Sequence, residues 1–231
     1  MATATKKKNR IAESNGDELE GLIHQQQEVQ ISAPNMRQVI FTVIGTTPFV
    51  QNKFSNKARE AMKRKQQAGS QGKKGIKREP KDFQENYEQA QHRSHEGWRG
   101  IPANAFRAAM VDACRLVGFK MTVAKLAVFI EADGFDADDG TPLVKITKGE
   151  PRYVEHCVRN ESGVSDIRAR PMWDQGWEAI VRVNYDADMF TALDVANLLA
   201  RVGTQLGVGE GRPNSKKSTG QGWGLFRVES A

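Results

Sequence analysis

The alternation of apolar and polar residues at 177–185 restricts the fold of this 231-residue chain more than any other feature. Every second residue of the segment WEAIVRVNY is apolar, from Trp177 to Tyr185. Because successive side chains of a strand point to opposite faces, this pattern predicts a strand with one buried face. Apolar residues at helical spacing follow from about Asp188, and WGLFRV at 223–228 alternates again, which predicts a helix and a final strand. The apolar positions of this helix are Val195, Leu198, Leu199, Val202 and Leu206.

The first half of the chain supplies a similar strand and helix. QVIFTVIGTTPF (38–49) is a β-branched run with two apolar faces, which predicts a central strand. IPANAFRAAMVDACRLVG (101–118) predicts a helix with Gly118 as its C-cap, and LAVFIEA and PLVKITKG predict strands joined by the acidic turn DGFDADDG. DIRARP (166–171) predicts only a short extended segment. The order strand, helix, strands, strand, helix, strand predicts an α+β, ferredoxin-like (RRM-like) antiparallel sheet with two helices packed on one face.

The basic charge is concentrated in an insertion between the first strand and the first helix. The whole chain has a net charge of +6, yet residues 53–78 contain ten Lys or Arg residues and one acid, Glu60. We expect a disordered polar tail at 1–34, a single domain at 35–231, and a basic helical insertion at 52–99 that is mobile until it meets an acidic partner. Ten cations of the insertion are predicted to neutralise nucleic-acid phosphates: Lys53, Lys57, Arg59, Lys63, Arg64, Lys65, Lys73, Lys74, Lys77 and Arg78.

A glycine-rich, basic stretch, GVGEGRPNSKKSTGQGWGLFRV, occupies 207–228. It is no nucleotide P-loop, because Ser215 stands where that motif needs glycine and the order runs from helix to strand. It is either a connector whose glycines permit turns or a loop whose backbone and cations approach a phosphate. In the second case alanine at Gly209 and Gly211 should impair binding more than folding. The predicted phosphate-contacting residues are Gly207, Gly209, Gly211, Arg212, Lys216, Lys217, Gly220 and Gly222.

Three further residues are predicted to contact nucleic acid from the free face of the sheet. Alternation in the last strand turns Phe226 and Val228 toward the helices and leaves Trp223 and Arg227 on the other side. Arg182 lies on the polar side of the strand at 177–185. Trp223 would either stack on a base or fill a gap in the core.

Residues that could catalyse a reaction form no recognisable set. The four histidines, His24, His92, His95 and His156, have no partner motif nearby in the sequence. The Asp-rich turn lacks the calcium-loop pattern, so we interpret it as an acidic hairpin turn. The sequence therefore predicts no cofactor, no metal site and no enzyme activity.

Two cysteines, Cys114 and Cys157, form neither a metal-ligand pair nor a disulfide framework. This usage favours reduced thiols in the cytoplasm. No stretch of the sequence is apolar enough over eighteen residues to predict a membrane span.

Three segments together resemble the repeat-associated mysterious protein (RAMP) superfamily of RNA-binding proteins found in CRISPR effectors. These are FTVIGTTPF, IPANAFRAAMVDACR and GVGEGRP…GQGWGLFRV, within 37–50, 100–118 and 176–228. The chain is most similar to the backbone subunits that polymerise along a guide RNA, or to a relative carried by a phage or mobile element. The resemblance implies a ferredoxin-like fold, a glycine-rich loop that meets the RNA backbone, and a long basic insertion.

We therefore expect a non-catalytic, sequence-independent protein that binds single-stranded RNA, or less favourably DNA, and assembles in copies along the strand. Other effector subunits are possible partners. Two alternatives remain open. One is a ferredoxin-like endoribonuclease that uses His92, His95 or His156, and the other is a protein–protein scaffold with a basic insertion.

Overall fold

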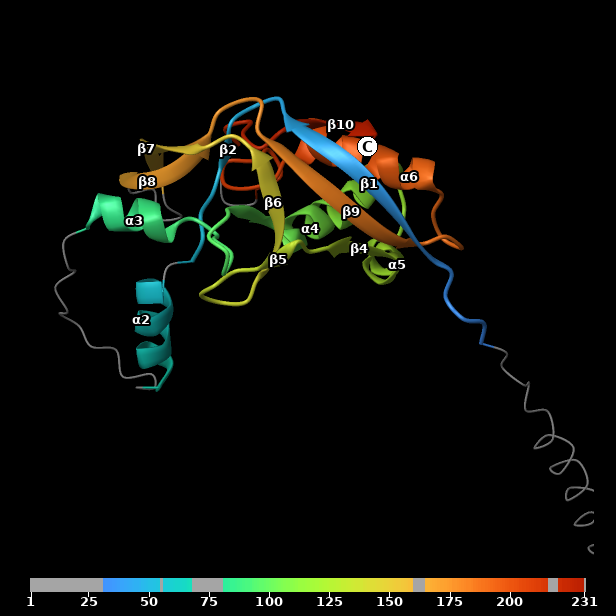
Figure 1. Ribbon diagram of the computed structural model, residues 1–231, viewed down its shortest axis with the longest axis horizontal. Helices are drawn as coiled ribbons and strands as arrows, with labels where there is room; N and C mark the ends of the chain where they lie inside the picture. The colour runs from blue at the N-terminus through green and yellow to red at the C-terminus, as the bar shows by residue number, and fades with distance from the viewer. Residues whose placement is uncertain (1–30, 55, 68–80, 160–164, 216–219, 231) are drawn as a thin grey trace, which may run out of the picture. The chain divides into compact units, whose positions relative to one another are not determined.

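The fold was analysed in a computed structural model, which describes residues 31–54, 56–67, 81–159, 165–215 and 220–230 (Figure 1). Asn35–Ala231 forms one compact unit. The predicted polar tail lies outside the described residues as far as residue 30. The architecture is α+β with antiparallel strands, in agreement with the sequence-based prediction.

The larger sheet has seven strands, and β1 lies inside it, between β10 and β9, as predicted. Only one face of β1 is buried, however, since Ile40 on the other face is 40% exposed. Three strands run in the order β10 (Phe226–Ser230), β1 (Met36–Gly45) and β9 (Glu178–Asp186). The other edge of β9 is shared by β4 (Val128–Glu131) and β6 (Pro142–Lys148). Two short strands, β3 (Gly100–Pro102) and β5 (Gly134–Phe135), pair with β6.

One face of this sheet packs on helices α4 (Ala103–Ala113) and α6 (Ala192–Arg201). The alternation in β9 is confirmed, because its predicted inner residues, from Trp177 to Tyr185, are all buried. The apolar positions predicted for the second helix are buried as well. α6 begins later than Asp188, at Ala192, since Thr191 and Asp194 form a reciprocal capping box there.

The first helix ends where the sequence predicted. After α4, the 3₁₀ turn η1 (Cys114–Val117) stops at Gly118, whose φ of 72° is left-handed. Val117, the last residue of the predicted helix before Gly118, is half exposed because it lies in that last turn. The predicted strand LAVFIEA begins as helix α5 (Met121–Ala127), and only β4 is extended.

A second sheet was missed by the sequence analysis. It has the order β2 (Phe49–Val50), β8 (Ser165–Trp173) and β7 (Pro151–Arg159), and it contains the segment DIRARP. Helix α3 (Phe83–Gln89) packs against this hairpin, with the rings of Tyr87 and Tyr153 5.4 Å apart. Helix α2 (Asn56–Gln67) carries the first part of the basic insertion. Figure 1 shows the β7–β8 hairpin beside α3.

The insertion is not wholly external to the domain, contrary to the sequence-based expectation. Its last part is built into the fold, because Arg93 and Ser94 form strand bridges with Arg99 and Asp136. Gln91 and His92 are buried there. Within the described residues, the helices are too short or too polar for any of them to span a membrane.

Candidate nucleic-acid interface and a buried ion-pair cluster

Helix α2 carries the described basic residues of the insertion outward. The side chain of Arg64 is 82% exposed and lies 3.7 Å from Glu60 one turn earlier, a weak surface pair. Lys63 is exposed and has no ion-pair partner among the described residues. Arg59 is different, because its guanidinium binds Asp139 at 2.8 Å. Six predicted cations cannot be described: the side chains of Lys57 and Lys65, and the whole of Lys73, Lys74, Lys77 and Arg78, lie outside the described residues.

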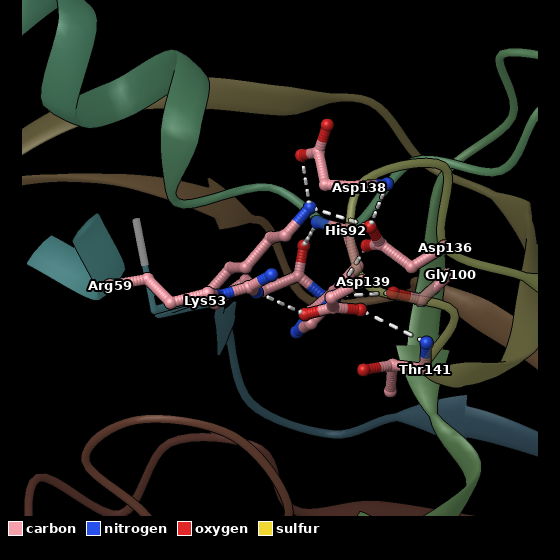
Figure 2. Close-up of polar contacts among 9 residues, drawn as sticks. Lys53, Arg59, His92, Gly100, Asp136, Asp138, Asp139 and Thr141 are labelled. Atoms are coloured by element: carbon pink, nitrogen blue, oxygen red, sulfur yellow. Dashed lines mark hydrogen bonds and ion pairs between the residues drawn. The ribbon is translucent and has the colours of Figure 1, made fainter. Parts of the chain in front are cut away.

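Lys53 does not lie on the surface. Only 5% of it is exposed, and its Nζ lies 2.6 Å from Asp136 Oδ1 and 2.5 Å from Asp138 Oδ2 (Figure 2). Two carboxylates already neutralise this ammonium. The prediction that Lys53 contacts a phosphate does not fit this placement, and we leave it out of the interface.

His92 completes a cluster around Asp136. Its Nδ1 lies 2.8 Å from Asp136 Oδ2, and its backbone N–H donates to Gln51 Oε1 at 2.8 Å. Asp136 is fully buried and also accepts the Asp138 amide at 2.9 Å. The sequence showed no partner for His92, and the fold supplies one in Asp136. The Asp-rich segment does form the predicted hairpin turn, between β5 and β6, and it contributes a buried charge as well.

The pKa values of the cluster follow from burial and from these bonds. Burial would raise the pKa of Asp136, but the hydrogen bonds from Lys53, the Asp138 amide and His92 outweigh it and hold that pKa low. Burial would lower the pKa of Lys53, and the two carboxylates raise it instead. For His92, burial outweighs the bond to Asp136, so its pKa is lowered and the ring is neutral at pH 7.

Three residues of this cluster are of types that can bind a metal ion. Ligand atoms of His92, Asp136 and Asp139 lie within 4.8 Å of one another. Lys53 and Arg59 already neutralise these carboxylates, however, so the geometry fits an ion-pair cluster. No local pattern could have revealed it, since Lys53 and Asp136 are 83 residues apart.

The glycines of the 207–224 loop are required by the packing of the chain on itself. Gly209 and Gly211 both have positive φ, and a Cβ there would strike the Val50 carbonyl and the Trp223 ring. Backbone bonds from Glu210 N to Val50 O and from Gly224 N to Pro48 O fasten the loop to β2 and its approach. We therefore correct the expectation for Gly209 and Gly211: alanine at these positions should disturb folding first.

The other glycines of the loop differ in their surroundings. Gly207 has positive φ, and a Cβ there would lie 2.9 Å from the Trp223 carbonyl. A Cβ at Gly220 would lie 3.5 Å from Pro213, and one at Gly222 would meet open space. Gly222 is therefore the loop glycine whose backbone a ligand could approach most closely.

Trp223 is neither an exposed stacking platform nor a fully buried core residue. It is half-buried, and its ring lies edge-on to His156 with the centroids 5.3 Å apart. Arg212 donates to the Gly209 carbonyl at 2.9 Å, which stabilises the turn. Lys216 and Lys217 lie outside the described residues.

The free face of the larger sheet has balanced charges. Arg182 binds Asp133, and Arg227 lies 3.0 Å from Glu229 on its own strand. Along the described strands β1, β9 and β10, the aromatic side chains are buried on the helix side. The base-stacking aromatics of an RNA-recognition-motif sheet are thus missing from these three strands.

Comparison with protein-family models and with curated proteins gave no match. The resemblance to the RAMP superfamily stays a prediction.

Proposed function

We propose that this protein is a non-catalytic, sequence-independent binder of single-stranded nucleic acid, RNA more than DNA. The observation that carries the proposal is helix α2, which exposes Lys63 and Arg64 without a strong acidic partner among the described residues. The buried Lys53–Asp136–His92 cluster anchors the chain that leads into this helix, and Arg59 ties the helix to Asp139. A basic helix held at one end in this way offers phosphate contacts without base contacts, which is the basis of sequence-independent binding.

The fold is compatible with this function. The strand order β10–β1–β9–β4/β6, with α4 and α6 on one face, supports a ferredoxin-like plan with added strands. Together with the resemblance of the three sequence segments, it supports membership of the RAMP superfamily and assembly of copies along one strand. The balanced charges on the free sheet face favour α2 and the glycine-loop side as the contact surface.

Measurement of affinity for a labelled oligouridylate at several salt concentrations tests the proposal. Lys63→Gln with Arg64→Gln should weaken binding and lower the slope of log affinity against log salt by about 0.7 for each lost phosphate contact. The matched control is Lys120→Gln with Lys125→Gln, which removes the same charge from exposed positions at α5. Equal effects of the two double variants would contradict a role for α2.

An endoribonuclease is the second candidate, and the His92–Asp136 pair beside Lys53 is the observation that favours it. A neutral imidazole that donates Nδ1–H to a carboxylate keeps Nε2 as a proton acceptor, as a general base requires. Labelled RNA incubated with the protein in EDTA distinguishes the candidates. Retention without cleavage supports the binder, whereas discrete cuts that disappear in a folded His92→Gln variant support the enzyme.

A further inference from the structure

Two arginines of the β7–β8 hairpin converge on one carboxylate of the glycine loop. Arg168 and Arg170 are alternate residues of β8 and so share a face. Arg168 Nη1 lies 3.0 Å from Glu210 Oε1, and Arg170 Nε lies 2.7 Å from Glu210 Oε2. The side chains of Arg170 and Glu210 are 13% and 15% exposed, while Arg168 is 32% exposed and opens to solvent.

A histidine with unmet hydrogen bonds lies on the same face. His156 on β7 stands directly opposite Arg168 in the strand register. Both of its ring nitrogens are buried, and neither has a hydrogen-bond partner within the described part of the chain. Burial lowers the pKa of His156. The negative charge of Glu210 raises this pKa, whereas the positive charges of Arg170 and Arg168 lower it further. A buried polar ring without partners is costly, so it marks a place where a ligand can supply a bond.

The Glu210 side chain can turn away from the arginines while its backbone stays in place. Its backbone N–H is held by the Val50 carbonyl at 2.9 Å, and positive-φ glycines flank it on both sides. Its carboxylate reaches the arginines through rotatable bonds. Guanidinium groups bind carboxylate and phosphate in similar geometry, so a phosphate can replace a carboxylate on the same two donors.

The surrounding charges also favour an incoming anion. Arg168 Nε lies 3.5 Å from Asp166, but that carboxylate is bound by Lys81 as well. When Glu210 turns away, Arg170 loses its carboxylate partner, and Arg168 and Lys81 share Asp166 among the described residues. The face therefore has a positive excess that a phosphodiester would neutralise.

We propose that Arg168, Arg170 and His156 form a phosphodiester-binding site that Glu210 closes in the free protein. A backbone phosphate of single-stranded nucleic acid displaces the Glu210 carboxylate, binds the two guanidinium groups and offers an acceptor to His156. Trp223, which packs on His156, lies beside the site where an adjacent base would come. The inference rests on the proposed function and adds three residues to the predicted set of binding cations and loop residues.

Glu210→Gln tests the inference in the full chain, with Glu178→Gln as its control. Glu178 is also a partly buried carboxylate in an ion pair, 2.7 Å from Lys148, so both variants remove one negative charge. Glu210→Gln should bind a labelled oligouridylate at least about fivefold more tightly than Glu178→Gln, because two charge-assisted contacts are freed. Adding Arg168→Gln to Glu210→Gln should abolish the gain.

The outcomes separate this inference from the function on which it rests. If the wild-type protein binds oligouridylate and Glu210→Gln matches Glu178→Gln, the closed site is refuted and the binder stands. If neither the wild-type protein nor Glu210→Gln binds, the proposed function fails and the inference fails with it. If Glu210→Gln does not fold, the single variant Arg168→Gln tests the inference. Its affinity for oligouridylate should be lower than that of Arg115→Gln, the control that removes an exposed arginine on η1. Equal affinities of the two variants would refute the site.

Discussion

Gly222 and Gly224 have almost the same backbone conformation, with φ of 74° and 72°, but very different neighbours. A Cβ at Gly222 would meet open space, whereas one at Gly224 would overlap the Val208 carbonyl. Gly222→Ala should cost about 1–2 kcal/mol of folding stability from its positive φ alone. Gly224→Ala should cost about 1–3 kcal/mol more, because the loop must shift. Urea unfolding of both variants measures the difference, and equal losses would contradict the close approach of the two chain segments.

His92 predicts a pH dependence of stability. Its pKa is lowered from about 6.5 by burial, so the unfolded state takes up a proton at higher pH than the folded state. The unfolded state therefore binds more protons as pH falls below about 6.5, and the free energy of unfolding decreases there. The lowered pKa of His156 acts in the same direction.

Between about pH 6.5 and 5, the free energy of unfolding should decrease less steeply in His92→Gln than in the wild-type protein. Part of the decrease should remain, because His156 is still present. His95→Gln is the control, since it removes an exposed imidazole. Urea unfolding at a series of pH values measures both slopes. Identical slopes in the wild-type protein and His92→Gln would contradict the effect of burial on this ring.

At the scale of elements, the Lys53 cluster joins the end of the β2 segment, the chain after α3 and the β5–β6 loop (Figure 2). Asp136→Asn should cost about 3–5 kcal/mol, because the buried ammonium of Lys53 loses its inner partner. Asp138→Asn should cost no more than about 1 kcal/mol, since the Asp138 side chain is 49% exposed and Asp136 remains. Thermal or urea unfolding compares the two variants. Similar losses would mean that Asp136 is not the centre of the cluster.

Elements with a strong apolar period were predictable from the sequence, and those held by distant partners were not. β9 and α6 follow their patterns because one face of each enters the core. The β7–β8 hairpin was missed because its faces carry charged residues, such as Arg168, whose partner Glu210 lies 42 residues away in the chain. Lys53 and His92 look like surface residues of a polar insertion until the fold brings Asp136 to them. Local sequence holds no signal for such pairings.

At the scale of the whole molecule, the basic residues divide into two groups with different roles. In the free protein, carboxylates engage Lys53, Arg59, Arg168 and Arg170, and these pairs hold the insertion and the glycine loop in place. Of these four, only Arg168 and Arg170 are proposed to exchange their carboxylate for a phosphate. Lys63 and Arg64 are exposed on α2 and have no strong acidic partner among the described residues, as the proposed contact with a polyanion requires. Part of the basic residues of this +6 chain therefore serves the structure, and the proposed binding surface is smaller than the composition suggests.

Assembly along a strand is the prediction that concerns the whole molecule. If each copy covers a fixed length of backbone through phosphate contacts, the mass of the complex should rise in steps as the oligouridylate is lengthened. Size-exclusion chromatography with light scattering measures that mass. RNase digestion should return every complex to the mass of the free protein, because the strand holds the copies together. The Lys63→Gln, Arg64→Gln variant should need higher RNA concentration to reach the same steps. A complex that keeps one copy at every RNA length, or an oligomer that survives digestion unchanged, would show that the strand does not organise the assembly.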